Sequence, residues 1–322
     1  MQRIEILSQE LFESHREEIG IVDAFRNRFS VCLGWHYFLD LAWIVREIRS
    51  TLPRGALVLD AGAGSGILQL ILAELGYNVI SADFVGRGLT DYLERYRGVI
   101  HSLNNQSRTV GNRYTRHLCA EYSKDGLNML SALGRLLEGF GGGRGSLRSL
   151  EKHRFSPQQA APEPIFQGDP GRCCGRIFLY RCDLKEMPLL PDGLVDAVVS
   201  LSALEHNPHG NCQLCIDELL RVTGGGRKLV VTVSASQGED WFHEPSKGWC
   251  YSEQTLKKLF RLPSEVPSNF LRREELFEKL KRDGGELQKR LDPFYFKSGA
   301  NGMPWGKWDP AYQPVGVVKV KD

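Results

Sequence analysis

Two stretches of the chain alternate short, fully apolar runs with helical patterns. In the first, residues 56–60 (ALVLD) and 79–82 (VISA) are candidates for buried strands, and residues 67–75 between them predict a helix ending at Gly76. The second stretch resumes the alternation, with strand candidates at 177–180, 195–201 and 228–234 and a helix candidate at 212–222. Continuous apolar strands joined by helices are typical of a parallel sheet that is covered on both faces.

The segments that flank these stretches predict helices at both ends of the chain. The first thirty residues are polar and helix-like, and residues 35–50 space their apolar side chains three or four apart, which predicts an amphipathic helix. We therefore expect residues 1–55 to form an N-terminal helical cap. Toward the other end, 253–260 and 272–281 are helix candidates, and 315–320 (VGVVKV) alternates like a terminal antiparallel edge strand.

Between the two stretches, residues 86–176 break the alternation. They contain helix candidates at 114–125 and 127–137, followed by a glycine-rich run and a Pro/Gln/Ala segment at 156–170, which indicates a loop or mobile arm. We interpret the whole segment as an insertion that could cover a substrate.

Length and composition describe an ordinary globular protein. The chain has 322 residues, 42% hydrophobic and 25% charged, which fits two domains or one decorated domain and excludes collagen-like and largely disordered chains. Eight cysteines are too few for a disulfide scaffold, and neither a signal peptide nor an apolar run of membrane-spanning length is present. We expect a cytoplasmic protein with reduced thiols.

The charges that sum to a net charge of +2 are unevenly distributed along the chain. Residues 87–176 hold 14 Lys and Arg against 8 Asp and Glu, a net of +6, so the remainder has a net of −4. A solvated basic face would explain this excess, and so would an anionic acceptor such as a phosphorylated sugar or lipid.

The most informative motif is VLDAGAGSG at 58–66. Glycines directly after a strand let the backbone turn sharply and approach a ligand closely. A dinucleotide fingerprint requires glycine at position 67, which is Ile67, so the spacing argues against a dehydrogenase. Asp83 lies 21 residues beyond Gly62, at the end of the next strand, where an acid can hold both ribose hydroxyls.

Together with RCDLKEMPLLPDGLVDAVVSLSALEH at 181–206, these residues resemble the class I S-adenosylmethionine-dependent methyltransferases. The resemblance covers 56–84 and 177–236. It implies that the glycine motif wraps the methionine part, that Asp83 binds the ribose, and that Asp183 and Leu184 lie beside the adenine. The residues that it implies for cofactor binding are Asp60, Ala61, Gly62, Gly64, Gly66, Asp83, Phe84, Asp183, Leu184 and Ser200.

The same resemblance implies an α/β fold: a doubly wound, seven-stranded, mostly parallel sheet with a reversed last hairpin. The core would comprise 56–85 and 177–322, interrupted by the long insertion after the second strand. The aromatic tail, at 240–260 and 298–321, is similar to those of type 11-like bacterial methyltransferases of polysaccharide and glycan biosynthesis. We therefore expect methyl transfer to a polar small-molecule or glycan-type acceptor, on oxygen, by in-line displacement.

Transfer to a hydroxyl would benefit from a general base. His206 and Glu205 follow the fourth predicted core strand, and His243 follows the fifth, where loops at the carboxyl ends of strands build sites. His206 is the first choice because an imidazole titrates near neutral pH. The competing interpretation is that Leu204, Glu205 and His206 only cap the strand.

Two further groups of residues can be explained by packing as well as by a function. His206, His209, Cys212 and Cys215 have metal-ligand chemistry, but both cysteines fall on the apolar face of a predicted helix, so we expect no metal. The tail aromatics could stack on a ligand or pack in the core. We expect Trp305 and Trp308, flanked by Gly and Pro, to be exposed.

Two other functions stay open. A nucleic-acid or protein methyltransferase would dock its substrate on the basic insertion. A non-catalytic module would bind the cofactor, or nothing, and contact partners through the same insertion.

Overall fold

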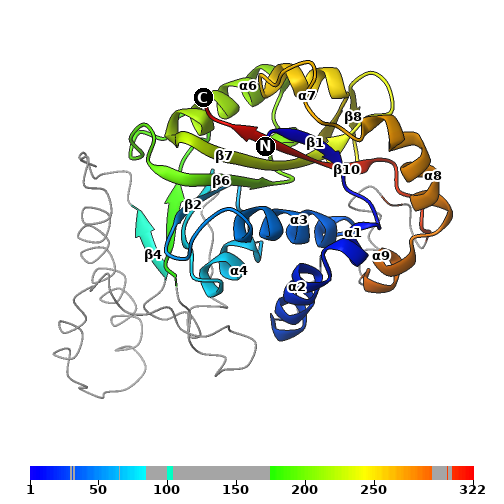
Figure 1. Ribbon diagram of the computed structural model, residues 1–322, viewed down its shortest axis with the longest axis horizontal. Coiled ribbons are helices and arrows are strands. Elements are labelled where there is room, and N and C mark those ends of the chain that lie inside the picture. Colours follow the sequence, from blue (N-terminus) through cyan, green and yellow to red (C-terminus); the bar gives the residue numbers. More distant parts are fainter. Residues whose placement is uncertain are drawn as a thin grey trace.

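The computed structural model describes residues 1–29, 31, 33–64, 66–84, 100–103, 175–291, 303 and 307–322. In this part of the chain, ten strands form one sheet with helices on both faces (Figure 1). The strands are β1 (Arg3–Ile6), β2 (Leu57–Ala61), β3 (Asn78–Asp83), β4 (Ile100–Leu103), β5 (Ile177–Arg181), β6 (Val195–Leu201), β7 (Thr223–Ala235), β8 (Trp241–His243), β9 (Gly248–Tyr251) and β10 (Gln313–Val320). The helices are α1 (Leu11–Ser14), α2 (Arg16–Phe29), α3 (Tyr37–Arg49), α4 (Leu68–Glu74), α6 (His209–Val222), α7 (Glu253–Leu259), α8 (Arg273–Arg282) and α9 (Gly285–Arg290), with short 3-10 turns at Leu204–His206 and Phe270–Arg272.

The strand order is that of a doubly wound α/β sheet with one reversed strand. Along the sheet the order is β1-β10-β7-β6-β2-β3-β5-β4, and all neighbours from β7 to β4 are parallel. The strand β10 is antiparallel to both β7 and β1. The predicted α/β class, mostly parallel with a reversed strand near the C-terminus, is therefore confirmed. The described sheet has ten strands where seven were predicted, because β1 and β4 extend it at its two edges and β8 and β9 pair beside β7.

Both faces of the central strands are buried, as their continuous apolar runs predict. In β2, Val58 packs in the core shared with α3 and α4, whereas Leu57 and Leu59 belong to the core on the opposite face, with α6 and α7. Figure 1 shows these helix pairs on the two sides of the sheet. Since neither face meets solvent, the ends of the strands are where polar groups can gather.

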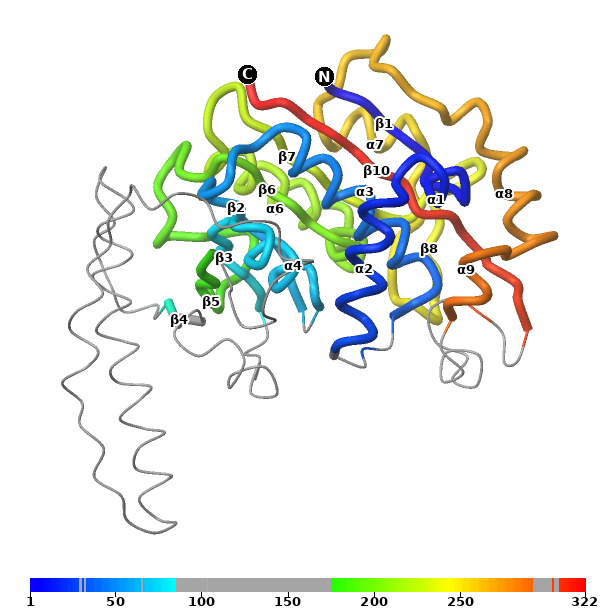
Figure 2. The backbone as a smooth tube through the Cα atoms, turned by 60° about the horizontal axis from the view of Figure 1, so that its bottom comes forward, coloured from blue at the N-terminus to red at the C-terminus, as the bar shows by residue number. Residues whose placement is uncertain are grey.

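The last strand differs from its prediction. The chain 313–320 is antiparallel, but it is an interior strand between β7 and β1 and not an edge (Figure 2). Seven of its eight residues are buried. A β-carbon at Gly316 would lie 2.5 Å from the indole of Trp43, so glycine is what lets α3 pack against this strand.

The N-terminal cap also differs from its prediction, because residues 3–6 are a strand. Arg3 in β1 forms a two-pronged ion pair with Glu47 of α3, at 2.6 and 3.2 Å, and Glu5 accepts a hydrogen bond from the Trp43 indole at 2.9 Å. Ten of the thirteen residues of α3 are buried, including the charged Asp40 and Glu47, whereas Arg46 is exposed. The predicted amphipathic helix is therefore present, but its buried side is much wider than the apolar stripe that the spacing indicated.

The insertion contributes one described strand. β4 pairs in parallel with β5 and extends the sheet beyond the predicted core. The remaining predictions for this segment, including helices at 114–125 and 127–137, lie outside the described residues, as does Trp305. None of the described helices is both long and apolar enough to cross a bilayer.

We expect Gly316→Ala to destabilise the fold. The added methyl group would overlap the Trp43 ring, and overpacking of a core site costs about 1–3 kcal/mol. Gly225→Ala is the matched control, since a β-carbon at that exposed strand position meets nothing within 4 Å. Urea unfolding should give a lower midpoint for Gly316→Ala alone, and equal midpoints for the two variants would refute the packing argument.

Candidate functional site

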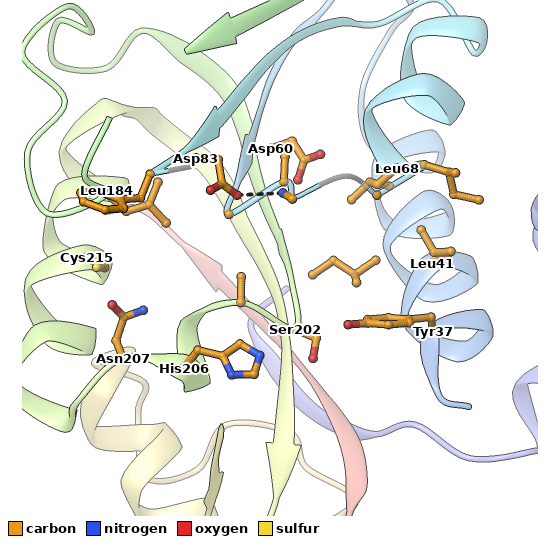
Figure 3. Close-up of a pocket in the computed structure, with 18 of the residues that line it drawn as sticks. Tyr37, Leu41, Asp60, Leu68, Asp83, Leu184, Ser202, His206, Asn207 and Cys215 are labelled. Atoms are coloured by element: carbon orange, nitrogen blue, oxygen red, sulfur yellow. Dashed lines mark hydrogen bonds between the residues drawn. The ribbon is translucent and has the colours of Figure 1, made fainter. Parts of the chain in front are cut away.

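A cavity of about 640 Å³ opens at the carboxyl ends of β2, β3 and β6. The loops that follow these three strands form one side of it, and α3 with the residues before it forms the other. Figure 3 shows Tyr37 and Leu41 on the α3 side and His206 and Asn207 on the opposite side. Parallel strands commonly bring their functional loops together at this edge.

The glycine motif makes the turn after β2. Gly62 has φ of +73°, and a β-carbon there would lie 2.5 Å from the β-carbon of Ala203 in the loop after β6. Its amide and that of Ala63 both donate to the carbonyl of Ala82 at the end of β3, at 2.9 and 3.1 Å. The missing side chain thus allows three loops to meet at one point and leaves backbone, not side chains, against the cavity.

Asp83 fixes the turn from the next strand. Its Oδ2 accepts a hydrogen bond from the amide of Gly64 at 2.8 Å, the contact drawn as a dashed line in Figure 3. Gly64 itself has φ of +49°, a conformation that L side chains rarely adopt. The carboxylate of Asp83 therefore orients the loop and lines the cavity at the same time.

The third side of this region comes from the loop after β5. Asp183 accepts from the amide of Lys185 at 3.0 Å and pairs with its ammonium group at 3.2 Å. Leu184 lies beside the Gly62 turn and lines the cavity with Asp183.

Eight of the ten residues predicted to bind a cofactor line this cavity: Asp60, Gly62, Gly64, Gly66, Asp83, Phe84, Asp183 and Leu184. Asp60 lies at the buried end and Phe84, 69% exposed, at the rim. The structure places the other two, Ala61 and Ser200, behind the lining. Both are fully buried, and the Ser200 hydroxyl donates to the Ala61 carbonyl at 2.9 Å.

The α3 side of the cavity was not predicted from the sequence. Val31, Leu33 and Leu41 give it an apolar wall, from which Tyr37 presents a hydroxyl group (Figure 3), and Leu201 at the end of β6 adds a fourth aliphatic side chain to the lining. The available signal was the four-residue spacing of Tyr37 and Leu41, which equally describes a core helix face.

His206 is the predicted base that reaches the cavity. Its Nδ1 lies 2.9 Å from the carbonyl oxygen of Lys247. A carbonyl can only accept, so Nδ1 carries the proton and Nε2 is the basic nitrogen of the neutral ring. This backbone contact orients the ring and selects its tautomer.

Glu205 points away from the cavity into the protein. It is 1% exposed, one oxygen accepts from the Ser202 hydroxyl at 2.7 Å, and its Oε2 has no hydrogen-bond partner among the described residues. Burial raises the pKa of Glu205, against a smaller opposing effect of His206. Ser202 has φ of +45°, and its amide donates to the Thr232 carbonyl at 3.0 Å. Glu205 thus braces a strained residue that lines the cavity.

His243 also lies outside the cavity lining. Its Nδ1 is 2.7 Å from the Ser246 hydroxyl, and its ring meets that of Tyr312 edge-on at 5.2 Å. Burial lowers the pKa of His243, which keeps it neutral in the interior.

The remaining clusters of the sequence are explained by packing. Cys212 and Cys215 are buried on α6, and burial raises the pKa of Cys215 to about 11. Over the residues that the structure describes, no three His, Cys, Asp or Glu side chains are grouped to hold a metal ion. Trp308 is half-buried and donates to the Leu280 carbonyl at 2.8 Å, so its predicted exposure is wrong.

Comparison with known proteins gives distant structural likenesses. No protein-family model matches the chain, and no curated protein matches it in sequence. The chain is similar to the [4+2]-cyclase SpnF, with 15% identity over 88% of this chain and 83% of that one and a TM-score of 0.44. It is also similar to the geranyl diphosphate C-methyltransferase of Streptomyces coelicolor A3(2), with 12% identity, coverage of 89% and 82%, and a TM-score of 0.37.

A further likeness is to a protein from an antibiotic biosynthesis pathway of Anabaena variabilis ATCC 29413, with 15% identity and a TM-score of 0.29. It covers 60% of this chain and 45% of that protein, so the chain spans less than half of that protein's length. Identities and TM-scores of this size assign no activity to the chain.

We expect Glu205→Gln to change the pH dependence of stability. Because burial raises the folded-state pKa of Glu205, its contribution to stability is complete below its ordinary pKa of 4.5 and is lost as the pH rises through the folded value. The uncharged amide avoids that loss. The free energy of unfolding of the variant, relative to the parent protein, should therefore rise with pH above 4.5.

Urea denaturation between pH 4 and 8 measures this difference. Glu244→Gln is the control, because the Glu244 side chain is 73% exposed. A difference for Glu205→Gln that stays constant across the pH range would contradict the buried, protonated carboxyl.

Proposed function

We propose that this chain is an S-adenosylmethionine-dependent methyltransferase that transfers a methyl group to an oxygen of a small-molecule acceptor. The observation that carries the proposal is the meeting of the Gly62 turn with Asp83 and the 183–184 loop around one cavity. These are the positions that the sequence resemblance assigns to cofactor binding, and they come from three separate strands.

The residues at this end of the cavity fit that cofactor. Gly62 and Gly64 both line the cavity and present backbone to it, which leaves room for a chain that lies against the turn. The carboxylate of Asp83 can accept hydrogen bonds from two adjacent ribose hydroxyls while its Oδ2 holds the loop. Leu184 and Phe84 offer apolar surface for the purine ring.

S-adenosylmethionine would supply an electrophilic methyl group on a positively charged sulfur. The protein then has to hold the acceptor oxygen in line with that methyl group and exclude water. The apolar α3 wall, with Leu33 and Leu41 both buried, serves the exclusion of water. Tyr37 and Asn207 lie on facing sides and can orient a polar acceptor group between them (Figure 3).

His206 is the residue that we propose takes the acceptor proton. Its Nε2 is the basic nitrogen, and the proton on Nδ1 stays in the hydrogen bond to Lys247. With S-adenosylmethionine bound, the acceptor oxygen would take the methyl group as the bond from that group to sulfur breaks, and S-adenosylhomocysteine would be the leaving group. The acceptor proton would pass to Nε2 of His206, and the Lys247 carbonyl would stabilise the imidazolium. Glu205 acts as a positioning residue through Ser202.

The residues that line the first cavity indicate which kind of acceptor would fit it. Four aliphatic side chains face the space beside Tyr37 and His206, which favours an acceptor with an apolar body and one reactive hydroxyl over a fully hydroxylated sugar. The glycan-type acceptor suggested by the tail remains the competing candidate. Docking of nucleic acid or protein on the insertion stays a prediction, since 104–174 lie outside the described residues.

We expect S-adenosylhomocysteine to raise the melting temperature of the protein and Asp83→Ala to reduce that rise at equal ligand concentration. Loss of one charged acceptor of two hydrogen bonds should weaken binding by about ten-fold to a hundred-fold. Thermal unfolding and calorimetric titration measure both effects. Asp192→Ala is the control, because Asp192 is 82% exposed and outside the cavity. No ligand-induced shift in the parent protein would overturn the cofactor proposal.

We expect His206→Ala to keep S-adenosylhomocysteine affinity and to lower methyl transfer by about 10²–10⁴-fold. The assay follows a radiolabelled methyl group from S-adenosylmethionine into hydroxylated aromatic compounds, nucleotide sugars, oligosaccharides and RNA. His15→Ala, whose ring contacts Ser14 far from the cavity, should be unaffected. Unchanged turnover in His206→Ala would remove the general base from the mechanism.

A further inference from the structure

A second cavity, of about 360 Å³, lies at the carboxyl end of β7 against α8. Its described lining shares no residue with that of the first cavity. Tyr312 lies between the two: it lines the second cavity, and its hydroxyl is 3.3 Å from Nε2 of His36, the neighbour of Tyr37 in the first. Nothing in the proposed methyl transfer uses this second space.

One face of α8 points its charged and aromatic side chains toward this cavity. Arg273, Phe277 and Lys281 are spaced four residues apart, and all three line the cavity. The guanidinium of Arg273 is held in place because its Nη1 donates to the Ser236 carbonyl at 2.9 Å. Its Nε is buried and has no hydrogen-bond partner among the described residues.

A second, independent observation comes from the opposite wall. Gln313, the first residue of β10, is 2% exposed, and neither the oxygen nor the nitrogen of its carboxamide has a hydrogen-bond partner in the part of the chain that is described. An unsatisfied buried amide costs about 1–3 kcal/mol. Both atoms are enclosed in this conformation, so a ligand would recover that cost where the side chain turns toward the cavity and meets one acceptor and one donor.

The remaining residues of the lining indicate the shape and the charge of a ligand that would fit the cavity. Trp241 is 36% exposed at the cavity and offers a flat apolar surface. Arg273 and Lys281 bring two positive charges, and Glu239 brings one negative charge. Lys281 is paired with Glu278 at 3.8 Å, so Arg273 is the cation of this lining that has no carboxylate partner among the described residues. One available cation favours a singly charged group over a polyphosphate or a nucleic-acid backbone.

We propose that this cavity is a second ligand site, which binds a small aromatic or otherwise flat molecule through a carboxylate group. Nη2 of Arg273, beside the Nη1 that donates to Ser236, donates to the carboxylate. The carboxamide of Gln313 pairs with a polar group of the same molecule, and Trp241 contacts its apolar part. The site is independent of the proposed methyltransferase activity.

The test uses benzoate as the probe, with benzamide as its neutral counterpart and phenyl phosphate as its phosphate counterpart, all at one ionic strength. Ligand-observed NMR titration gives the affinities for the full chain. We expect benzoate to bind and benzamide to bind at least ten-fold more weakly. Arg273→Gln should weaken benzoate binding at least ten-fold, whereas Arg282→Gln, an exposed cation at the end of the same helix, should not.

Three results would overturn the proposal. Benzoate binding no tighter than benzamide would remove the anion site, and tighter binding of phenyl phosphate would replace the carboxylate by a phosphate. Unchanged benzoate affinity in Arg273→Gln would place the probe elsewhere. S-adenosylhomocysteine affinity, measured on the same samples, should be equal in both variants, which separates this test from that of the proposed function.

Discussion

Burial of both faces of the parallel sheet is the constraint on which the rest of the molecule depends. Because Val58 and its neighbours in β2 are enclosed by helices above and below, the sheet offers polar groups and ligands only its ends. Every functional feature described above follows from that restriction. Gly62 and Asp83 lie just beyond the last buried residues of β2 and β3, and His206 lies in the 3-10 turn that follows β6.

At this edge, hydrogen bonds to the backbone set the chemistry of side chains. The Lys247 carbonyl decides which nitrogen of His206 is basic, and the Gly64 amide decides which oxygen of Asp83 is engaged. Glu205 is the residue before His206, but its side chain turns inward and burial raises its pKa. Glu205 and His206 therefore have different roles because their side chains leave the 3-10 turn in different directions, one into the protein and one into the cavity.

The central strands could be predicted from the sequence, because short continuous apolar runs between turn residues are compatible with few other structures. The glycine turn could also be predicted, because glycine readily adopts the positive φ angles that Gly62 and Gly64 have. The interior position of β10 could not be predicted, because it depends on pairing with the four residues of β1 near the other end of the given sequence. The sequence also could not show that Asp40 and Glu47 are buried, since that depends on His36 and Arg3 as their partners. The apolar wall around Tyr37 and the second cavity could not be predicted for the same reason. Each is formed by segments that are distant in the sequence, and no local pattern of residues indicates that they meet.

The pairing of β1 with β10 has a consequence for how this chain folds. Arg3 lies opposite Val318, so the sheet is completed by pairing two segments that are 315 residues apart in the sequence. Before that pairing forms, β1 has no neighbouring strand in the described sheet and the indole of Trp43 is not covered by β10. Contacts between such distant segments form slowly, because a long loop has to close first. Folding intermediates that lack this pair therefore expose a strand edge and apolar surface that the finished sheet hides.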